Sequence, residues 1–214
     1  MRRSAKGGAL MAPSKKLVLA SASPRRKSLL AVAGYRFETI ASEVDETLPG
    51  GLSPEDAAVE VARRKALAVV ARARDSVILA ADTIVVTPSG EIAGKPLDAA
   101  DARRMLRALS GSTHVVITGV FLIDASTGRT ASQAVSTRVV FGKMTGAEID
   151  AYVDSGEALG KAGAYAIQET GDRFVRRVDG SFTNVVGLPM EVVSRMLKSM
   201  HVPASAGRRR ADEG

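Results

Sequence analysis

Apolar residues recur along this chain in two patterns, one typical of strands and one typical of helices. Continuous apolar runs at residues 16–20 and from residue 76 onward predict buried strands, because a strand covered on both faces needs no polar alternation. The second run is predicted to end near Asp82, with a further strand continuing to a turn at residues 88–90. Residues 35–42 alternate enough to predict another strand.

Helical segments lie between the strands. The clearest start is Ser53, a hydroxyl N-cap followed by Pro54 at the first helical position and by two acids in the positive first turn. The remaining predicted elements are a helix with Ser23 as cap and Pro24 first, helices over residues 98–111 and 145–156, two strands within 113–142 joined by a turn around 126–128, and a terminal helix beginning near Pro189.

Strands and helices therefore alternate, and hairpin signals accompany the crossovers. This arrangement predicts an α/β protein with a mixed sheet flanked by helices. We find no internal repeat and no separating linker, so residues 16–200 are predicted as one domain. Residues 1–15 and 201–214, rich in Gly, Ala, Ser and Arg, are predicted as disordered basic tails.

The net charge of +7 belongs to the ends of the chain. Residues 1–16 carry five cations and no acid, and residues 198–214 carry four cations and two acids, which together account for the whole excess. A neutral core favours weak, nonspecific attraction of the tails to polyanions over a nucleic-acid-binding face.

Cysteine is absent, which excludes disulfides, thiolate metal sites and a thiol nucleophile and fits a reducing compartment. No apolar run approaches the ~18 residues of a membrane span, and lysines interrupt the apolar residues that a signal peptide would need. A cytoplasmic location without membrane association is therefore the expectation.

The stretch "SASPRR", residues 21–26, lies between a strand and a helix. Backbone N–H groups at a helix N-terminus form an anion site, and Ser21, Ser23, Arg25 and Arg26 add further donors. These residues predict a polyphosphate site, although an ordinary capped helix with solvated arginines would carry the same letters.

Acidic and basic candidates follow. Asp82 comes directly after a buried apolar run, where a carboxylate must be paired, hydrogen-bonded or metal-bound. Lys95 lies on a loop after a glycine, and Lys65 lies on a helix whose register is open. The cluster "SEVDE" contains three acids, of which Glu43 is the first. These acids either keep a loop soluble or supply metal ligands.

The chain contains the following motifs, taken in order: "ASASPRR", "SEVDE", a helical lysine, "ADT", "GKP", "LSG", "KAGAYAIQ" and "VVGLP". On these motifs, over about residues 17–197, the chain resembles the Maf family of nucleoside triphosphate pyrophosphatases. The resemblance implies an elongated mixed sheet with a cleft between two lobes, akin to inosine triphosphatase. It also implies hydrolysis between the α and β phosphates with a divalent cation, Mg²⁺ or Mn²⁺. The family often forms homodimers, which adds a homodimer to the expectations.

The resemblance also implies roles for the individual residues that match the family's motifs. Asp82 matches the catalytic proton acceptor of the family, and Arg25, Thr83 and Gln168 match the positions tied to a preference for dTTP and UTP. The Gln168 amide offers a donor and an acceptor for the N3–H and carbonyl of uracil or thymine. We expect Asp82 and Glu43 to hold metal, and Ser21, Ser23, Arg26, Lys65 and Lys95 to hold phosphates. Whether Asp82 is a base or mainly a ligand stays open.

The sequence also allows two alternative functions. The first is a nucleic-acid-binding or division-associated regulatory protein that uses the basic tails, although the tails lack the interleaved aromatic residues of single-strand binders. The second is the same enzyme class with a preference for modified purines, against which the Arg25, Thr83 and Gln168 set argues.

Overall fold

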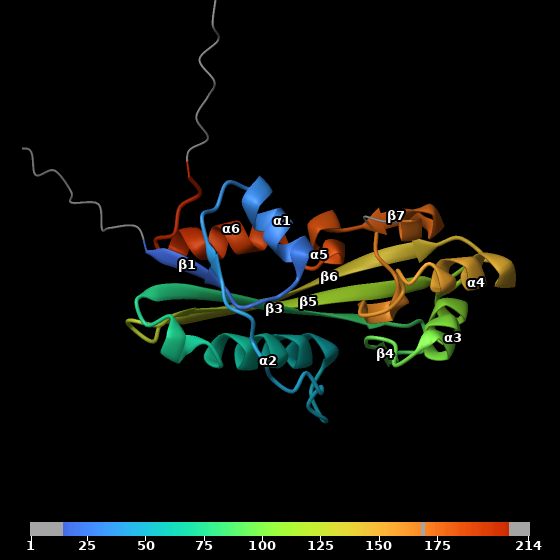
Figure 1. The fold of residues 1–214 in the computed structure, drawn as a ribbon, viewed down its shortest axis with the longest axis horizontal. Coiled ribbons are helices and arrows are strands. Elements are labelled where there is room, and N and C mark those ends of the chain that lie inside the picture. The colour runs from blue at the N-terminus through green and yellow to red at the C-terminus, as the bar shows by residue number, and fades with distance from the viewer. Residues whose placement is uncertain (1–14, 168–169, 206–214) are drawn as a thin grey trace, which may run out of the picture.

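The computed structural model describes residues 15–167 and 170–205. Within them, seven strands form one elongated mixed sheet (Figure 1). The strands are β1 (Lys16–Leu19), β2 (Glu38–Thr39), β3 (Ser76–Val86), β4 (Ile92–Ala93), β5 (Thr113–Asp124), β6 (Thr130–Phe141) and β7 (Val175–Asp179). Their order is β2-β1-β3-β5-β6-β7, with β4 also beside β3, and the expected mixed α/β class is confirmed.

The long strands β3, β5 and β6 form the centre of the sheet, and the short strands pair with only part of it. β1 pairs in parallel with residues 76–79 of β3, and β4 pairs antiparallel with residues 85–86. Residues 80–84 of β3 therefore have β5 on one side and no described strand on the other. This gap in the sheet edge follows the end of a parallel strand, the usual place for a ligand in an open α/β sheet.

Six helices of the described residues surround the sheet: α1 (Pro24–Val32), α2 (Pro54–Leu67), α3 (Ala99–Leu109), α4 (Gly146–Asp154), α5 (Phe182–Val186) and α6 (Met190–Ser199). Helix α2 covers one face, α1 and α6 cover the other, and α3 and α4 gather at the far end (Figure 1). None of these helices combines the length and apolar character that crossing a membrane requires.

Alternation along β1 explains the two faces. Leu17 and Leu19 join the apolar cluster beneath α1 and α6, whereas Val18 and Ala20 join the cluster beneath α2. A separate core at the far end includes Leu106 of α3, together with residues of β6 and α4. The core at the far end is thus separate from the two cores that lie on either side of β1.

The predicted helix starts are confirmed by their caps. The Ser53 hydroxyl accepts the backbone N–H of Asp56 at 3.1 Å, and Thr145 forms a reciprocal capping box with Glu148. Ser23 accepts the N–H of Arg26 at 3.4 Å, with Pro24 at the first position of α1. Hydrogen bonds between residues close together in the sequence therefore account for each of these helix starts.

Some boundaries differ from the sequence-based expectations. β3 runs uninterrupted through Asp82 because β5 pairs with it residue by residue from Val77 to Val86, so the predicted strand end near Asp82 is wrong. The strand expected over residues 35–42 shortens to the two residues of β2.

The predicted tails are described only where they adjoin the domain. In the C-terminal segment, Val202 is buried and the N–H of Ser205 donates to Gly34 O at 2.8 Å, so the chain continues to pack beyond residue 200. Lys15, in the N-terminal segment, forms an ion pair with Asp124. Residues 1–14 and 206–214 lie outside the described part of the chain.

Candidate active site

A cavity of about 510 Å³ lies at the gap in the edge of β3. Several parts of the chain meet there, among them the turn from β1 into α1, the unpaired edge of β3, the loop before α2 and the loop after β4. β3 contributes Val85 and two consecutive polar residues, Asp82 and Thr83, whose side chains point to opposite faces of the sheet. Both reach the cavity because no strand closes the edge between the two faces.

The N-terminus of α1 forms one wall. Ser21 is buried and its hydroxyl accepts the N–H of Ser23 at 3.2 Å, which shapes the turn before the helix. The first backbone N–H groups of a helix have no partner within the helix, and the helix dipole adds positive potential there. Together with Arg25, which also lines the cavity, this end of α1 suits an anionic group.

A row of alternating charges forms the opposite wall. The ammonium of Lys65, on α2, lies 2.6 Å from Asp82 Oδ1 and 2.9 Å from Glu46 Oε1. The second Glu46 oxygen, Oε2, lies 2.5 Å from the ammonium of Lys95. Lys65 and Asp82 are buried, whereas Glu46 and Lys95 are exposed, so the row runs from the interior to the mouth.

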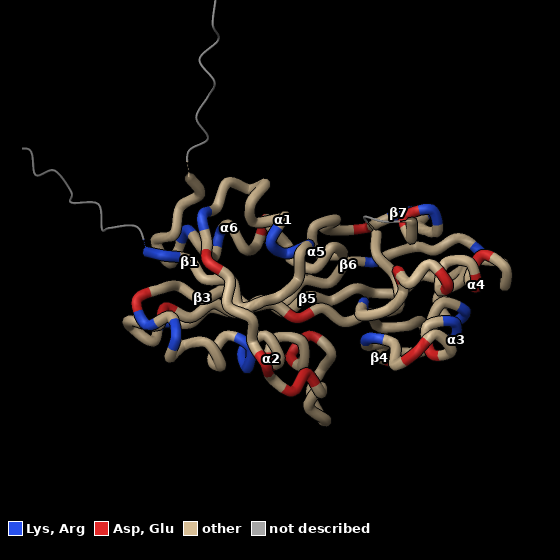
Figure 2. Tube along the Cα trace, in the orientation of Figure 1, with Lys and Arg blue, Asp and Glu red and all other residues tan. Residues whose placement is uncertain are grey.

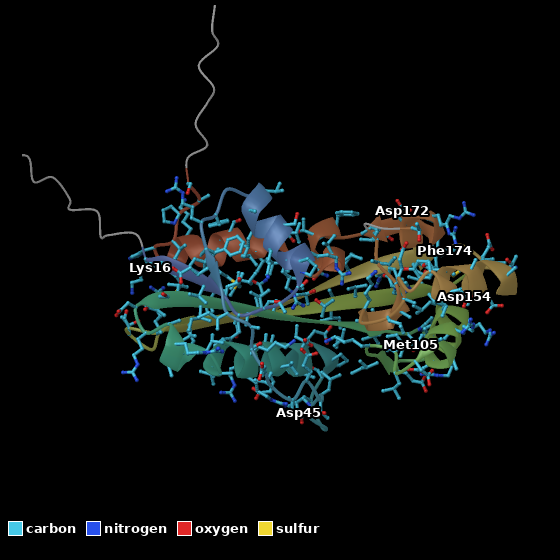
Figure 3. All side chains as sticks on the ribbon, in the orientation of Figure 1. Lys16, Asp45, Met105, Asp154, Asp172 and Phe174 are labelled. Atoms are coloured by element: carbon cyan, nitrogen blue, oxygen red, sulfur yellow. The ribbon has the colours of Figure 1, made fainter. Side chains whose placement is uncertain are left out.

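Glu46 is held in its charged form. Burial alone would raise its pKa, but hydrogen bonds from Lys65 and Lys95 outweigh that cost and lower the pKa to about 2. Glu46 belongs to the acidic cluster that the sequence singled out, yet the residue chosen from that cluster was Glu43. Glu43 is exposed and does not line the cavity, and Asp45 lies on the outer side of the loop (Figure 3).

The charged residues of the loop before α2 are all acidic, whereas α2 itself carries both acidic and basic positions (Figure 2). What distinguishes Glu46 from the other acids of this loop is therefore its direction, not its chemistry. No periodic pattern in "SEVDE" indicates which carboxylate faces inward, because the loop is irregular between β2 and α2.

Arg26 is part of the wall. Its guanidinium donates from Nε to Gly187 O at 2.9 Å, from Nη2 to Thr83 Oγ1 at 3.0 Å and from Nη1 to Ser21 Oγ at 3.4 Å. Burial lowers the pKa of Arg26, and the nearby carboxylates of Asp82 and Glu46 oppose that shift. The side chain therefore ties α1 to β3 and to the turn between α5 and α6.

The far wall is apolar and aromatic. Tyr165 lines the cavity, and its hydroxyl pairs with Nε2 of the buried His114 at 2.8 Å. Phe141 packs edge-on against both rings. Burial lowers the pKa of His114 to about 4, so the imidazole is neutral at pH 7 and acts as an anchor for Tyr165.

The structure thus brings together most of the residues that the sequence singled out. Those that line the cavity are Ser21, Ser23, Arg25, Arg26, Lys65, Asp82, Thr83 and Lys95. Glu43 is not among them, and Gln168 lies outside the described residues. Sequence reasoning did not select Glu46 for the site, and it also missed Tyr165 although "KAGAY" had drawn attention to the segment.

An open mixed sheet, a helix N-terminus and a row of paired charges at one sheet edge define an α/β protein with a polar, charged cleft beside an unpaired sheet edge. A family model described as Maf-like protein matches residues 16–200. The chain belongs to the Maf family.

Curated relatives cover nearly the whole domain. A dTTP/UTP pyrophosphatase of Geobacter sulfurreducens is 52% identical over 179 residues, which is 83% of this chain and 93% of that protein. Proteins of the same name from Bdellovibrio bacteriovorus and Pelotomaculum thermopropionicum are each 45% identical, over 85% and 86% of this chain and 96% of each relative.

Proposed function

We propose that this protein is a nucleoside triphosphate pyrophosphatase that hydrolyses dTTP and UTP to the monophosphate and pyrophosphate. The observation that carries the proposal is the row from Asp82 through Lys65 and Glu46 to Lys95, which faces the α1 N-terminus across one cavity. A triphosphate needs cations along its length, and water needs a carboxylate beside the phosphorus that it attacks. The names of the curated relatives support the choice of nucleotides.

In the proposed reaction a water oxygen forms a bond to the α phosphorus while the bond to the bridging oxygen of the β phosphate breaks. Asp82 accepts the proton of the water, and pyrophosphate departs with the negative charge of the bridging oxygen. Lys65, 2.6 Å away, holds the Asp82 carboxylate in place and stabilises its charge. The α1 N-terminus, Arg25 and Lys95 bind the phosphate oxygens.

A divalent cation fits the carboxylates of the cavity. No cluster of three or more His, Asp or Glu side chains that could hold a metal occurs among the described residues. Mg²⁺, however, is commonly bound by one or two carboxylates, with substrate phosphates and water completing its shell. Asp82 and Glu46 are the two acids of the cavity, and a cation there would activate water and neutralise phosphate charge.

Substitutions at Glu46 and Glu43 show which of the two carboxylates holds the metal. We expect Glu46→Gln to raise the Mg²⁺ concentration for half-maximal UTP hydrolysis by at least ~10-fold, because a neutral amide is a weaker ligand. Glu43→Gln, the matched change at an exposed position three residues earlier, should leave that concentration unchanged. An effect of Glu43→Gln with none of Glu46→Gln would restore the assignment made from the sequence.

The function itself is tested by pyrophosphate release from dTTP, UTP, CTP, GTP and 7-methyl-GTP with Mg²⁺ or Mn²⁺. Selective turnover of dTTP and UTP is the expected result. Turnover of 7-methyl-GTP alone would show that the residues at Arg25, Thr83 and Gln168 were misread, and a folded protein without turnover of any nucleotide would refute the proposal.

Two expectations from the sequence belong to the same proposal, a homodimer and a cytoplasmic location. Family membership supports the first, and the absence of cysteine is compatible with the second.

A further inference from the structure

A chain of hydrogen bonds leads from the cavity into the interior through two threonine hydroxyls. Arg26 Nη2 lies 3.0 Å from Thr83 Oγ1, which lies 3.0 Å from Thr118 Oγ1 on the neighbouring strand β5. Thr118 Oγ1 in turn lies 3.1 Å from the backbone oxygen of Asn184 on α5. Thr83 lines the cavity and is half-buried, whereas Thr118 and Asn184 are fully buried.

The groups at the two ends of this chain of hydrogen bonds determine which hydroxyl donates and which accepts. A guanidinium can only donate and a carbonyl oxygen can only accept, whereas each hydroxyl has one proton and two lone pairs. Thr118 gives its proton to Asn184 O, so it must accept in its bond with Thr83. The Thr83 proton therefore points toward Thr118. Because Thr83 Oγ1 also accepts from Arg26, one lone pair is left for the cavity.

Both ends of the chain are held in place. Arg26 is fixed by its second bond to Gly187 O, at 2.9 Å. The Asn184 side chain donates from Nδ2 to Val116 O and to Thr137 Oγ1, each at 3.0 Å. Turning the Thr83 proton toward the cavity would require Thr118 to leave Asn184 O, and a buried hydrogen bond would be lost.

Thr83 also lies in the apolar part of the cavity. Asp82 points to the α2 face with the row of charges, whereas Thr83 points to the other face, opposite Thr118 of β5 and diagonal to Val116, which is paired with Val85. Val185 and Tyr165 continue the same wall. These apolar side chains suit the ring of a nucleobase, and Thr83 with its donor Arg26 supplies polar atoms at one end of the wall. An oxygen that can only accept would repel phosphate oxygens.

We propose that Thr118 is a positioning residue for base selection: it directs the Thr83 hydroxyl proton inward, so that Thr83 Oγ1 presents only an acceptor, to the N3–H of uracil or thymine. In this arrangement Thr83 takes the N3–H that the sequence assigned to Gln168, and the Gln168 amide is left to donate to a ring carbonyl. This inference rests on the proposed function. Cytosine has an unprotonated N3 and would place a second acceptor against Thr83, so the same oxygen that binds UTP opposes CTP.

The test compares kcat/KM for UTP and CTP in four proteins. Thr118→Val removes the acceptor for the Thr83 proton and keeps the shape of the side chain, and Asn184 O still accepts the N–H of Gly187 at 2.9 Å. The freed proton can then turn to cytosine N3, so we expect the UTP/CTP ratio to fall by about five- to tenfold. Thr118→Ser, which keeps the hydroxyl, should restore the wild-type ratio.

Thr137→Val is the matched control. Thr137 is buried and bonds to Asn184 but not to Thr83, so its loss should leave the ratio unchanged. An unchanged ratio in Thr118→Val, or an equal loss for both nucleotides, would overturn the inference. Should Thr118→Val fail to fold, Thr118→Cys takes its place, because a thiol is a weak acceptor and donor.

The two proposals fail in different ways. A wild-type protein that hydrolyses neither UTP nor dTTP refutes the proposed function. A wild-type protein that hydrolyses UTP and CTP equally well leaves the pyrophosphatase intact and refutes only the role of Thr118.

Discussion

Replacing Asp82 by asparagine should lower kcat/KM for UTP by about 10²- to 10⁴-fold, the usual contribution of a positioned proton acceptor. Asparagine has nearly the same shape but carries no charge, so it can neither take the proton of the attacking water nor attract a cation. The Lys65 ammonium keeps Glu46 as a partner at 2.9 Å, so the variant is expected to fold. Pyrophosphate release under single-turnover conditions measures the loss at the chemical step.

Asp124→Asn provides the matched control for this experiment. Asp124 is also a buried aspartate paired with a lysine, Lys15, but it lies at the end of β5 and outside the cavity. Its replacement should lower the free energy of unfolding and leave hydrolysis intact. If Asp82→Asn kept more than a tenth of wild-type kcat/KM, Asp82 would be neither the proton acceptor nor an essential ligand.

Replacing Gly119 by alanine should lower the free energy of unfolding by about 3 kcal/mol, the upper part of the range for overpacking a core. A Cβ at Gly119 would lie 2.3 Å from the backbone of α2, at Ala58 C and Val59 N. Backbone atoms cannot rotate away as a flexible side chain can, so the helix must move off the sheet. Denaturant unfolding measures the change in free energy, and thermal unfolding should show a fall in Tm of roughly 6–12 °C.

The same substitution should reduce hydrolysis. Gly119 lies opposite Asp82 in the sheet, and α2 carries Lys65 on the face that meets this part of β3. A shift of α2 would lengthen the 2.6 Å contact between Lys65 and Asp82. The close approach of the helix at one glycine therefore supports the geometry of the charged row.

Gly146→Ala is the control for Gly119→Ala. Gly146 is the first residue of α4, and a Cβ there would meet no atom within 4 Å. Alanine is the better helix former, so stability should stay the same or rise slightly. Equal behaviour of the two variants would show that α2 can retreat from β5 without cost.

The helix starts, that of α1 included, could be predicted because they depend on neighbours in the chain. Ser23, Pro24 and Ser53 act on backbone groups within three or four residues, and the structure confirms each start. The buried strands were equally visible as apolar runs. Asp82 was misplaced at a strand end because its strand partner, Gly119, is distant in sequence.

The choice among similar side chains could not be predicted. Glu46, not Glu43, meets the lysines because the loop before α2 brings that one carboxylate toward Lys65 and Lys95. Arg26, expected as a phosphate ligand, donates to Gly187 and Thr83, which follow it by 161 and 57 residues. Contacts of this range leave no periodic pattern in the sequence.

By itself, the sequence determined the α/β class, the helix caps, the family and eight of the residues that line the cavity, since local hydrogen bonds and hydrophobic periodicity act over a few residues. Only the tertiary structure decided which face of α2 turns Lys65 inward, which acid of the loop joins it and which groups surround the Thr83 hydroxyl. The reason is physical: a charge or a proton is oriented by the groups around it, and folding brings those groups together from distant parts of the chain.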